Sequence, residues 1–120
     1  YMDTAQSFVM SSDGKRVGYK VAKEVDGQIY EQMVIDDVPG PLFTRVSHLS
    51  FNKQGTMTAY RAYFADPATG TVRVAGIIGG SRTEVYDDII SEFVFSSDSS
   101  RITYYVEQGG KIEEVSHQLF

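Results

Sequence analysis

Asp13 and Asp98 each lie next to glycine or serine, and clusters of Asp with Gly are found in calcium-binding loops. Asp13 precedes Gly14, and Asp98 precedes Ser99. A loop of the EF-hand type spreads its oxygen ligands over about twelve residues and closes with Glu, and neither segment has that spacing. Short polar residues also accept hydrogen bonds from their own backbone in tight turns. We therefore expect turns at Asp13 and Asp98, and no metal site.

Adjacent carboxylates could supply a general acid and a general base. Neighbouring residues in a strand point to opposite faces, however, so such pairs do not converge on one substrate. The chain contains no Cys, and no Ser lies in a G-x-S-x-G elbow. We expect no catalytic residues and no cofactor, and hence a protein that is not an enzyme. The adjacent pairs are Asp36-Asp37, Asp87-Asp88 and Glu113-Glu114.

The composition limits the partners that the chain can have. It has 11 basic and 16 acidic residues in 120, and its net charge of -5 would repel a nucleic-acid backbone. No apolar stretch approaches the roughly 18 to 20 residues that a membrane span needs. The hydrophobic fraction of 42% is sufficient for a folded core. We expect one folded domain over residues 1–120 that binds no nucleic acid and inserts into no membrane.

A repeat organises the chain. Residues 8–19 read FVMSSDGKRVGY, residues 49–60 read LSFNKQGTMTAY, and residues 93–104 read FVFSSDSSRITY, so the copies are 41 and then 44 residues apart. The first and third copies are identical at seven of the twelve positions. Repeats of this length are typical of proteins built from one supersecondary unit used several times.

Each copy shows the same alternation of apolar runs and turn residues. A short apolar run ends in a polar turn, and a run rich in β-branched and aromatic residues follows. A polar loop then leads to a third run and a second turn to a fourth. No window has the spacing of an amphipathic helix. The predicted later strands are 16–22, 28–35 and 42–46, then 56–64, 71–78 and 83–86, then 101–106 and 111–115.

Four short antiparallel strands in each unit of about 42 residues are typical of a β-propeller blade. A single β-sandwich would not require the strand and turn pattern to recur in register. We therefore predict an all-β chain of three four-stranded antiparallel β-propeller blades, with repeats at approximately 7–46, 47–90 and 91–120. Phe51 and Phe95, and the tyrosines at matched positions, are expected to pack between blades.

The repeat resembles the WD-like β-propeller family of the Tol type and the prolyl-oligopeptidase type. Its hallmark is an apolar pair, then Ser-Pro-Asp-Gly-Lys, then a residue that leads to an aromatic. Residues 8–19 and 93–104 match it, with Ser12 and Ser97 where the family has Pro. Residues 86–91 look like the connection between blades. The resemblance implies a propeller, slightly favours a periplasmic or extracytoplasmic location, and leaves the compartment and the function unknown.

Three blades are too few to close a ring of the usual four to eight. In addition, only residues 116–120 remain for the fourth strand of the third unit, while residues 1–6 could donate a strand elsewhere. Exposed blade faces would be apolar patches that need a cover. We expect self-association into a homo-oligomer that completes the ring. One alternative is that these blades are part of a longer propeller, and another is that three blades stack as an open arc.

A candidate binding site follows from the alignment of the copies. Ser7, His48 and Glu92 occupy the equivalent position just before the first strand of each unit. The first strand of a propeller blade is the innermost, so these side chains are predicted to lie on the rim of a central channel. We expect a scaffold without catalysis for ligand recognition or for protein–protein interaction. The alternative is a propeller segment that gates a serine hydrolase or peptidase whose catalytic domain lies outside this chain.

Overall fold

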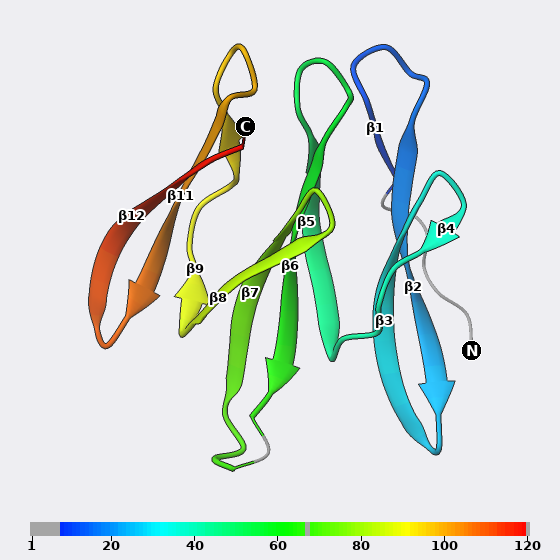
Figure 1. Cartoon of the computed structure of the whole chain (residues 1–120). Helices are drawn as coiled ribbons and strands as arrows, with labels where there is room; N and C mark the ends of the chain where they lie inside the picture. Colours follow the sequence, from blue (N-terminus) through cyan, green and yellow to red (C-terminus); the bar gives the residue numbers. More distant parts are fainter. Residues whose placement is uncertain (1–7, 67, 120) are drawn as a thin grey trace.

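The computed structural model describes residues 8–66 and 68–119, and these residues form strands and turns without a helix. Three four-stranded antiparallel sheets follow one another along the chain and lie side by side (Figure 1). The predicted all-β class and the three four-stranded units are therefore confirmed. The first sheet contains β1 (Val9–Met10), β2 (Val17–Val25), β3 (Gln28–Ile35) and β4 (Val38–Pro39). The second contains β5 (Arg45–Phe51), β6 (Thr58–Ala65), β7 (Val72–Ile78) and β8 (Ser81–Tyr86). The third contains β9 (Asp88–Ile89), β10 (Val94–Phe95), β11 (Arg101–Gln108) and β12 (Lys111–Gln118).

The turn after the first strand has the same hydrogen bonds in all three sheets. In the first sheet, the Arg16 amide donates to the Ser11 hydroxyl (3.0 Å), and the Gly14 amide donates to the Ser11 carbonyl (2.9 Å). Asn52 accepts the matching bonds in the second sheet, and Ser96 accepts them in the third. Local side-chain acceptors of this kind stabilise tight turns. The repeat seen in the sequence is thus also a repeat of hydrogen bonding.

These turns are also joined to one another, and the bonds run from sheet to sheet. The Ser12 hydroxyl donates to the Lys53 carbonyl (2.9 Å), and the Gln54 amide group donates to the Ser97 carbonyl (3.1 Å). Asn52, which is buried, donates to the Ser99 hydroxyl (2.9 Å). The turns therefore hold the three sheets at one common end.

The fourth strand of the first sheet differs from its prediction over residues 42–46. β4 pairs with β3 at Val38–Pro39, and pairing resumes only at the bridge between Glu31 and Phe43. Arg45–Val46 pairs with β6 and so belongs to the second sheet. Pro lacks a backbone N–H, and the segment Pro39-Gly40-Pro41 therefore interrupts the ladder with β3.

The third sheet obtains its four strands in a different way from the other two. No strand follows β12 within the described residues, and β9 instead pairs with β11 through Ile89 and Val106. β10 pairs with the same edge of β11 at Val94 and Phe95. The first strand of this sheet is therefore split into two pieces. Residues 88–89, expected within a connection between blades, belong to it.

Two hydrophobic clusters lie between the sheets, one on each face of the second sheet. On β6, Tyr60 and Ala62 pack toward the first sheet, while Ala59 and Tyr63 pack toward the third. Alternation along the strand produces this division. Within residues 8–66 and 68–119, only the second sheet is thus covered by another sheet on both faces. The cluster with the first sheet is Met33, Val46, Leu49, Tyr60, Ala62 and Ile77, and the cluster with the third is Ala59, Tyr63, Val74, Ile78, Tyr86, Ile89, Phe93, Ile102, Tyr104 and Val106.

The phenylalanines predicted to fill the spaces between the units lie at the edges of these clusters. Phe51 and Phe95 are partly buried, whereas Phe93 is only 6% exposed and lies within the cluster. The tyrosine prediction holds for Tyr60, Tyr63 and Tyr104, which are buried between sheets. Tyr19 is only partly buried, and for Tyr105, which is 43% exposed, the prediction is wrong. Matched turns and tyrosines therefore locate the packed faces, but the buried phenylalanine of the third sheet is Phe93, two residues before the expected Phe95.

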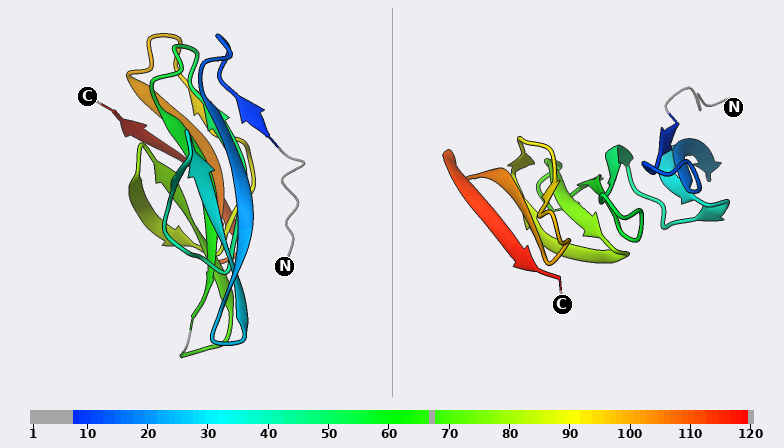
Figure 2. Two further views of the ribbon diagram at one scale, coloured as in Figure 1. Left: turned by 90° about the vertical axis from the view of Figure 1, so that its right-hand side faces the viewer. Right: turned by 90° about the horizontal axis from the view of Figure 1, so that it is seen from above.

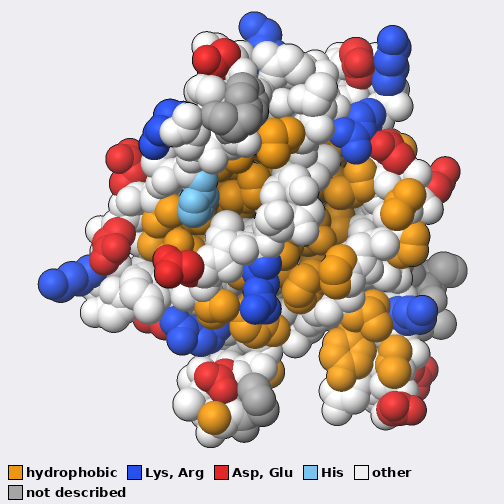
Figure 3. Space-filling view, viewed as in Figure 1, with side chains coloured by type: hydrophobic (Ala, Val, Ile, Leu, Met, Phe, Trp, Pro, Cys, Tyr) orange, Lys and Arg blue, Asp and Glu red, His pale blue; other side chains and the backbone are white. Residues whose placement is uncertain are grey.

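The described residues form a row of sheets that closes no ring (Figure 2). The row measures 43 × 36 × 21 Å. On the side shown in Figure 3, most acidic and basic side chains lie toward the outline, and hydrophobic side chains surround the hollows in the middle. The described part of the chain contains no helix with the length and apolar character of a membrane span.

Candidate binding site at the inner strands

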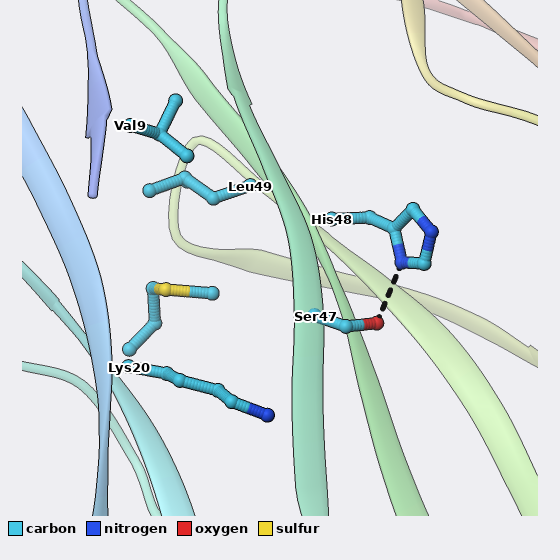
Figure 4. A pocket seen from close by; sticks show the side chains of 6 residues that line it. Val9, Lys20, Ser47, His48 and Leu49 are labelled. Atoms are coloured by element: carbon cyan, nitrogen blue, oxygen red, sulfur yellow. Dashed lines mark hydrogen bonds between the residues drawn. The ribbon is translucent and has the colours of Figure 1, made fainter. Parts of the chain in front are cut away.

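A β-bulge in β5 determines the position and direction of the His48 side chain. The pairing of β5 with β6 shifts between Ser47 and Ser50, so that one extra residue is accommodated in β5. His48 has a φ of +60°, a left-handed conformation that is uncommon for residues other than glycine. Figure 4 shows the result: Leu49 points toward Val9 of the first sheet, and His48 points to the other side of β5. The bulge thus exposes an imidazole at the edge of the second sheet.

Two small cavities have His48 among their lining residues. One cavity, of about 210 Å³, lies between the first and second sheets and is also lined by Lys20, Ser47 and Leu49 (Figure 4). The other, of about 90 Å³, lies between the second and third sheets and is also lined by Glu92. The His48 side chain can therefore contribute to binding in either cavity.

The surroundings of His48 favour its neutral form. Although the imidazole is exposed, its partial desolvation lowers its pKa below the ordinary value of 6.5, and the positive charges of Arg61 and Arg45 act in the same direction. The Glu92 carboxylate opposes them. The Ser47 hydroxyl and the His48 Nδ1 share a hydrogen bond of 2.7 Å. At neutral pH the ring can therefore act as one hydrogen-bond donor and one acceptor.

Glu92 lies at the equivalent place in the third sheet. It is in the gap between β9 and β10, where the first strand of that sheet is broken, and its side chain is exposed. The sequence placed His48 and Glu92 before their strands, but both strands begin earlier and are interrupted at these residues. Ser7, the third residue of the predicted rim, lies outside the described residues. The structure thus brings His48 and Glu92 to one cavity.

An arginine and tyrosine group beside His48 was missed by sequence reasoning. The Arg61 guanidinium donates to the Tyr63 hydroxyl (3.3 Å) and to the Ser91 carbonyl (3.0 Å), so it links the second sheet to the third. Arg45 lies over the Tyr63 ring at 4.2 Å from its centroid. Burial alone would raise the pKa of the Tyr63 hydroxyl, but its hydrogen bond with Arg61 and the charge of Arg61 bring it below the ordinary value.

The repeat contains a pattern that could have identified Arg61 from the sequence. Lys20 precedes it by 41 residues, the spacing of the first two copies, and both side chains lie on the face directed toward the next sheet. Lys20 is paired with Glu31 at 3.3 Å, whereas Arg61 and Arg45 have no ion pair within the described residues. A basic residue at this matched position could have been recognised as part of the site.

The other candidate chemical groups have structural roles. The Asp13 and Asp98 carboxylates accept hydrogen bonds within their turns, as predicted. Asp36 pairs with Arg16 at 2.8 Å, and Asp87 pairs with Arg73 at 3.4 Å. Across residues 8–66 and 68–119, no three His, Asp or Glu side chains are grouped so that they could hold a metal ion.

No protein-family model matches the chain, and no curated protein sequence or solved structure matches it.

Proposed function

We propose that the three sheets are consecutive blades of the β-propeller type and that the chain is a scaffold without catalysis. Its ligand is an extended peptide segment of a partner protein, bound along the inner strands. The observation that carries this proposal is that His48 and Glu92, at the interruptions of two neighbouring first strands, line one cavity.

The residues that line the two cavities support a peptide as the ligand. Leu49 and Val9 provide an apolar wall in the larger cavity, and Lys20 and His48 provide polar groups at its margin. Strand interruptions leave backbone N–H and C=O groups outside the ladder, where an extended peptide can pair with them. The second cavity adds the Glu92 carboxylate, so the site combines groups of both charges.

Panning of a phage-displayed library of random peptides against the protein tests this proposal. We expect enriched peptides whose binding to His48→Ala and to Glu92→Ala is weakened at least ~10-fold, a factor that corresponds to about 1.4 kcal/mol. Glu24→Ala is the matched control, because Glu24 is an exposed carboxylate in β2. Failure to enrich any peptide, or binding that both inner-strand variants retain in full, would contradict the proposal.

A further inference from the structure

The first sheet has an apolar face that points away from the second sheet, and no other sheet lies in front of it (Figure 2, left). Phe8, Leu49 and Phe93 occupy the same position in the three copies. Leu49 and Phe93 are 9% and 6% exposed, because each packs onto the sheet that precedes it. Phe8 is 59% exposed. Within the described residues, Phe8 therefore contacts the Tyr19 ring of its own sheet but has no preceding sheet to pack onto.

Two further positions show the same difference. Tyr60 and Tyr104 are buried against the preceding sheet, whereas the matched Tyr19 is only partly buried and contacts the edge of the Phe8 ring. Met10 is 60% exposed, while the matched Phe51 and Phe95 of the other sheets are partly buried. We define the open face of the first sheet by the residues Phe8, Met10, Tyr19 and Val21.

The opposite end of the row is built differently. On the far face of the third sheet, the Tyr105 hydroxyl donates to Glu114 (3.1 Å) and Arg101 donates to the Ser116 hydroxyl (2.9 Å). Glu114 stands where the second sheet has Gly76, whose missing side chain makes room for the Phe93 ring. The far face exposes Val94 as well, but it offers no such space to an incoming aromatic side chain.

Charge also distinguishes the open face. Side chains alternate along β2 and β3, and Lys23 is the one charged residue that these strands place on the same side as Tyr19. Two such faces bring together no charged side chains of these strands other than the two Lys23 residues, although each chain carries a net charge of -5. A contact between identical surfaces closes with twofold symmetry.

We propose that the open face of the first sheet binds the open face of a second copy of this chain, so that the protein is a symmetric dimer. Phe8, Met10 and Tyr19 of each copy lie at the contact. This arrangement replaces the end-to-end ring expected from the sequence, in which the first sheet of one copy would meet the third sheet of another. It does not depend on the peptide site, because the cavities of that site lie between the sheets and the open face points away from the second sheet.

Sedimentation equilibrium of the protein at micromolar concentrations tests the proposal. We expect twice the mass of one chain, and a dissociation constant that rises at least ~10-fold in Met10→Glu, because the carboxylate would be buried without a partner. Val94→Glu is the matched control, since Val94 is 62% exposed on the far face and Met10 is 60% exposed on the open face. A monomer, or a dimer that Val94→Glu dissociates and Met10→Glu does not, would overturn the proposal.

Spin labels provide a measurement that does not depend on how well a glutamate variant folds. The chain has no Cys, so Met10→Cys and Val94→Cys each give one labelled site. In the proposed dimer, labels at position 10 of the two copies lie close together and labels at position 94 lie far apart. An end-to-end ring would instead bring position 10 of one copy near position 94 of the other in a mixed sample. That second pattern, or the absence of any distance between chains, rejects the face-to-face dimer.

Discussion

Hydrogen bonds within a few residues determine the turns of this protein. The Asp98 carboxylate accepts bonds from the Ser100 hydroxyl (2.7 Å), the Ser100 amide (3.0 Å) and the Ser96 hydroxyl (2.9 Å). These bonds lower the pKa of Asp98 from 3.8 to about 2, and the bonds from Ser100 have the largest effect. Asp13 has the same arrangement with Ser11 and Lys15, and its pKa is also lowered. The sequence predicted both turns because all the partners lie within a few residues.

The lowered pKa of Asp98 predicts part of the acid sensitivity of the fold. Between pH values of about 4 and 2 the unfolded chain binds a proton at this residue and the folded chain does not, so the stability contributed by Asp98 is lost as the pH falls through this range. We expect Asp98→Asn to lower stability at pH 7 and to flatten its fall below pH 4, as measured by urea unfolding at several pH values. Asp37→Asn is the control, because the Asp37 carboxylate accepts no hydrogen bond from the described residues. Equal pH profiles for the two variants would contradict the assignment.

At the scale of the elements, close approach of neighbouring sheets depends on small residues in the second strand. Gly18 in β2 lies under Leu49 of β5, and a Cβ at position 18 would overlap the Leu49 side chain. Its backbone φ is not in the left-handed region, so the requirement for glycine here is one of space. The sequence showed Gly18 as one residue of a strand, and only the packing of two sheets shows why it carries no side chain.

Gly18→Ala is expected to reduce stability by about 1–3 kcal/mol, because Leu49 must move out of a packed position. In a Leu49→Ala background the same substitution should cost much less, since the overlap is gone. The effect of alanine on the unfolded chain is equal in the two backgrounds and cancels in the double-mutant cycle. Urea unfolding of the four proteins gives the coupling free energy. A coupling free energy near zero would show that Gly18 and Leu49 do not interact.

For the whole molecule, the position of a sheet in the row determines how well it is protected. β6 and β7 lie in the second sheet and have buried residues on both faces, whereas β12 has exposed residues along most of its length and forms an edge of the third sheet. Local opening is least favourable where most apolar surface would be uncovered. Stability should therefore be highest in the second sheet and lowest in the outer edge strands β4 and β12.

Amide hydrogen exchange followed by NMR checks this expectation. We expect the amides of β6 and β7 to exchange most slowly and those of β12 and β4 to exchange fastest, with β2 and β3 between them. The comparison between sheets is internal, so each strand serves as the control for the others. Equal protection of β12 and β6 would mean that the far face of the third sheet is covered in solution.

The sequence by itself determined the three copies, their turns, the all-β class and the equivalence of His48 with Glu92. These features depend on residues close together in the chain or on the spacing of the repeat. The tertiary structure decided that Arg45–Val46 and Asp88–Ile89 join the sheets that follow them, and that Arg61 reaches the Ser91 carbonyl. It also decided which faces are covered. The physical reason is that strand pairing and sheet packing join segments far apart in sequence, and their free energy depends on shapes that no local pattern records.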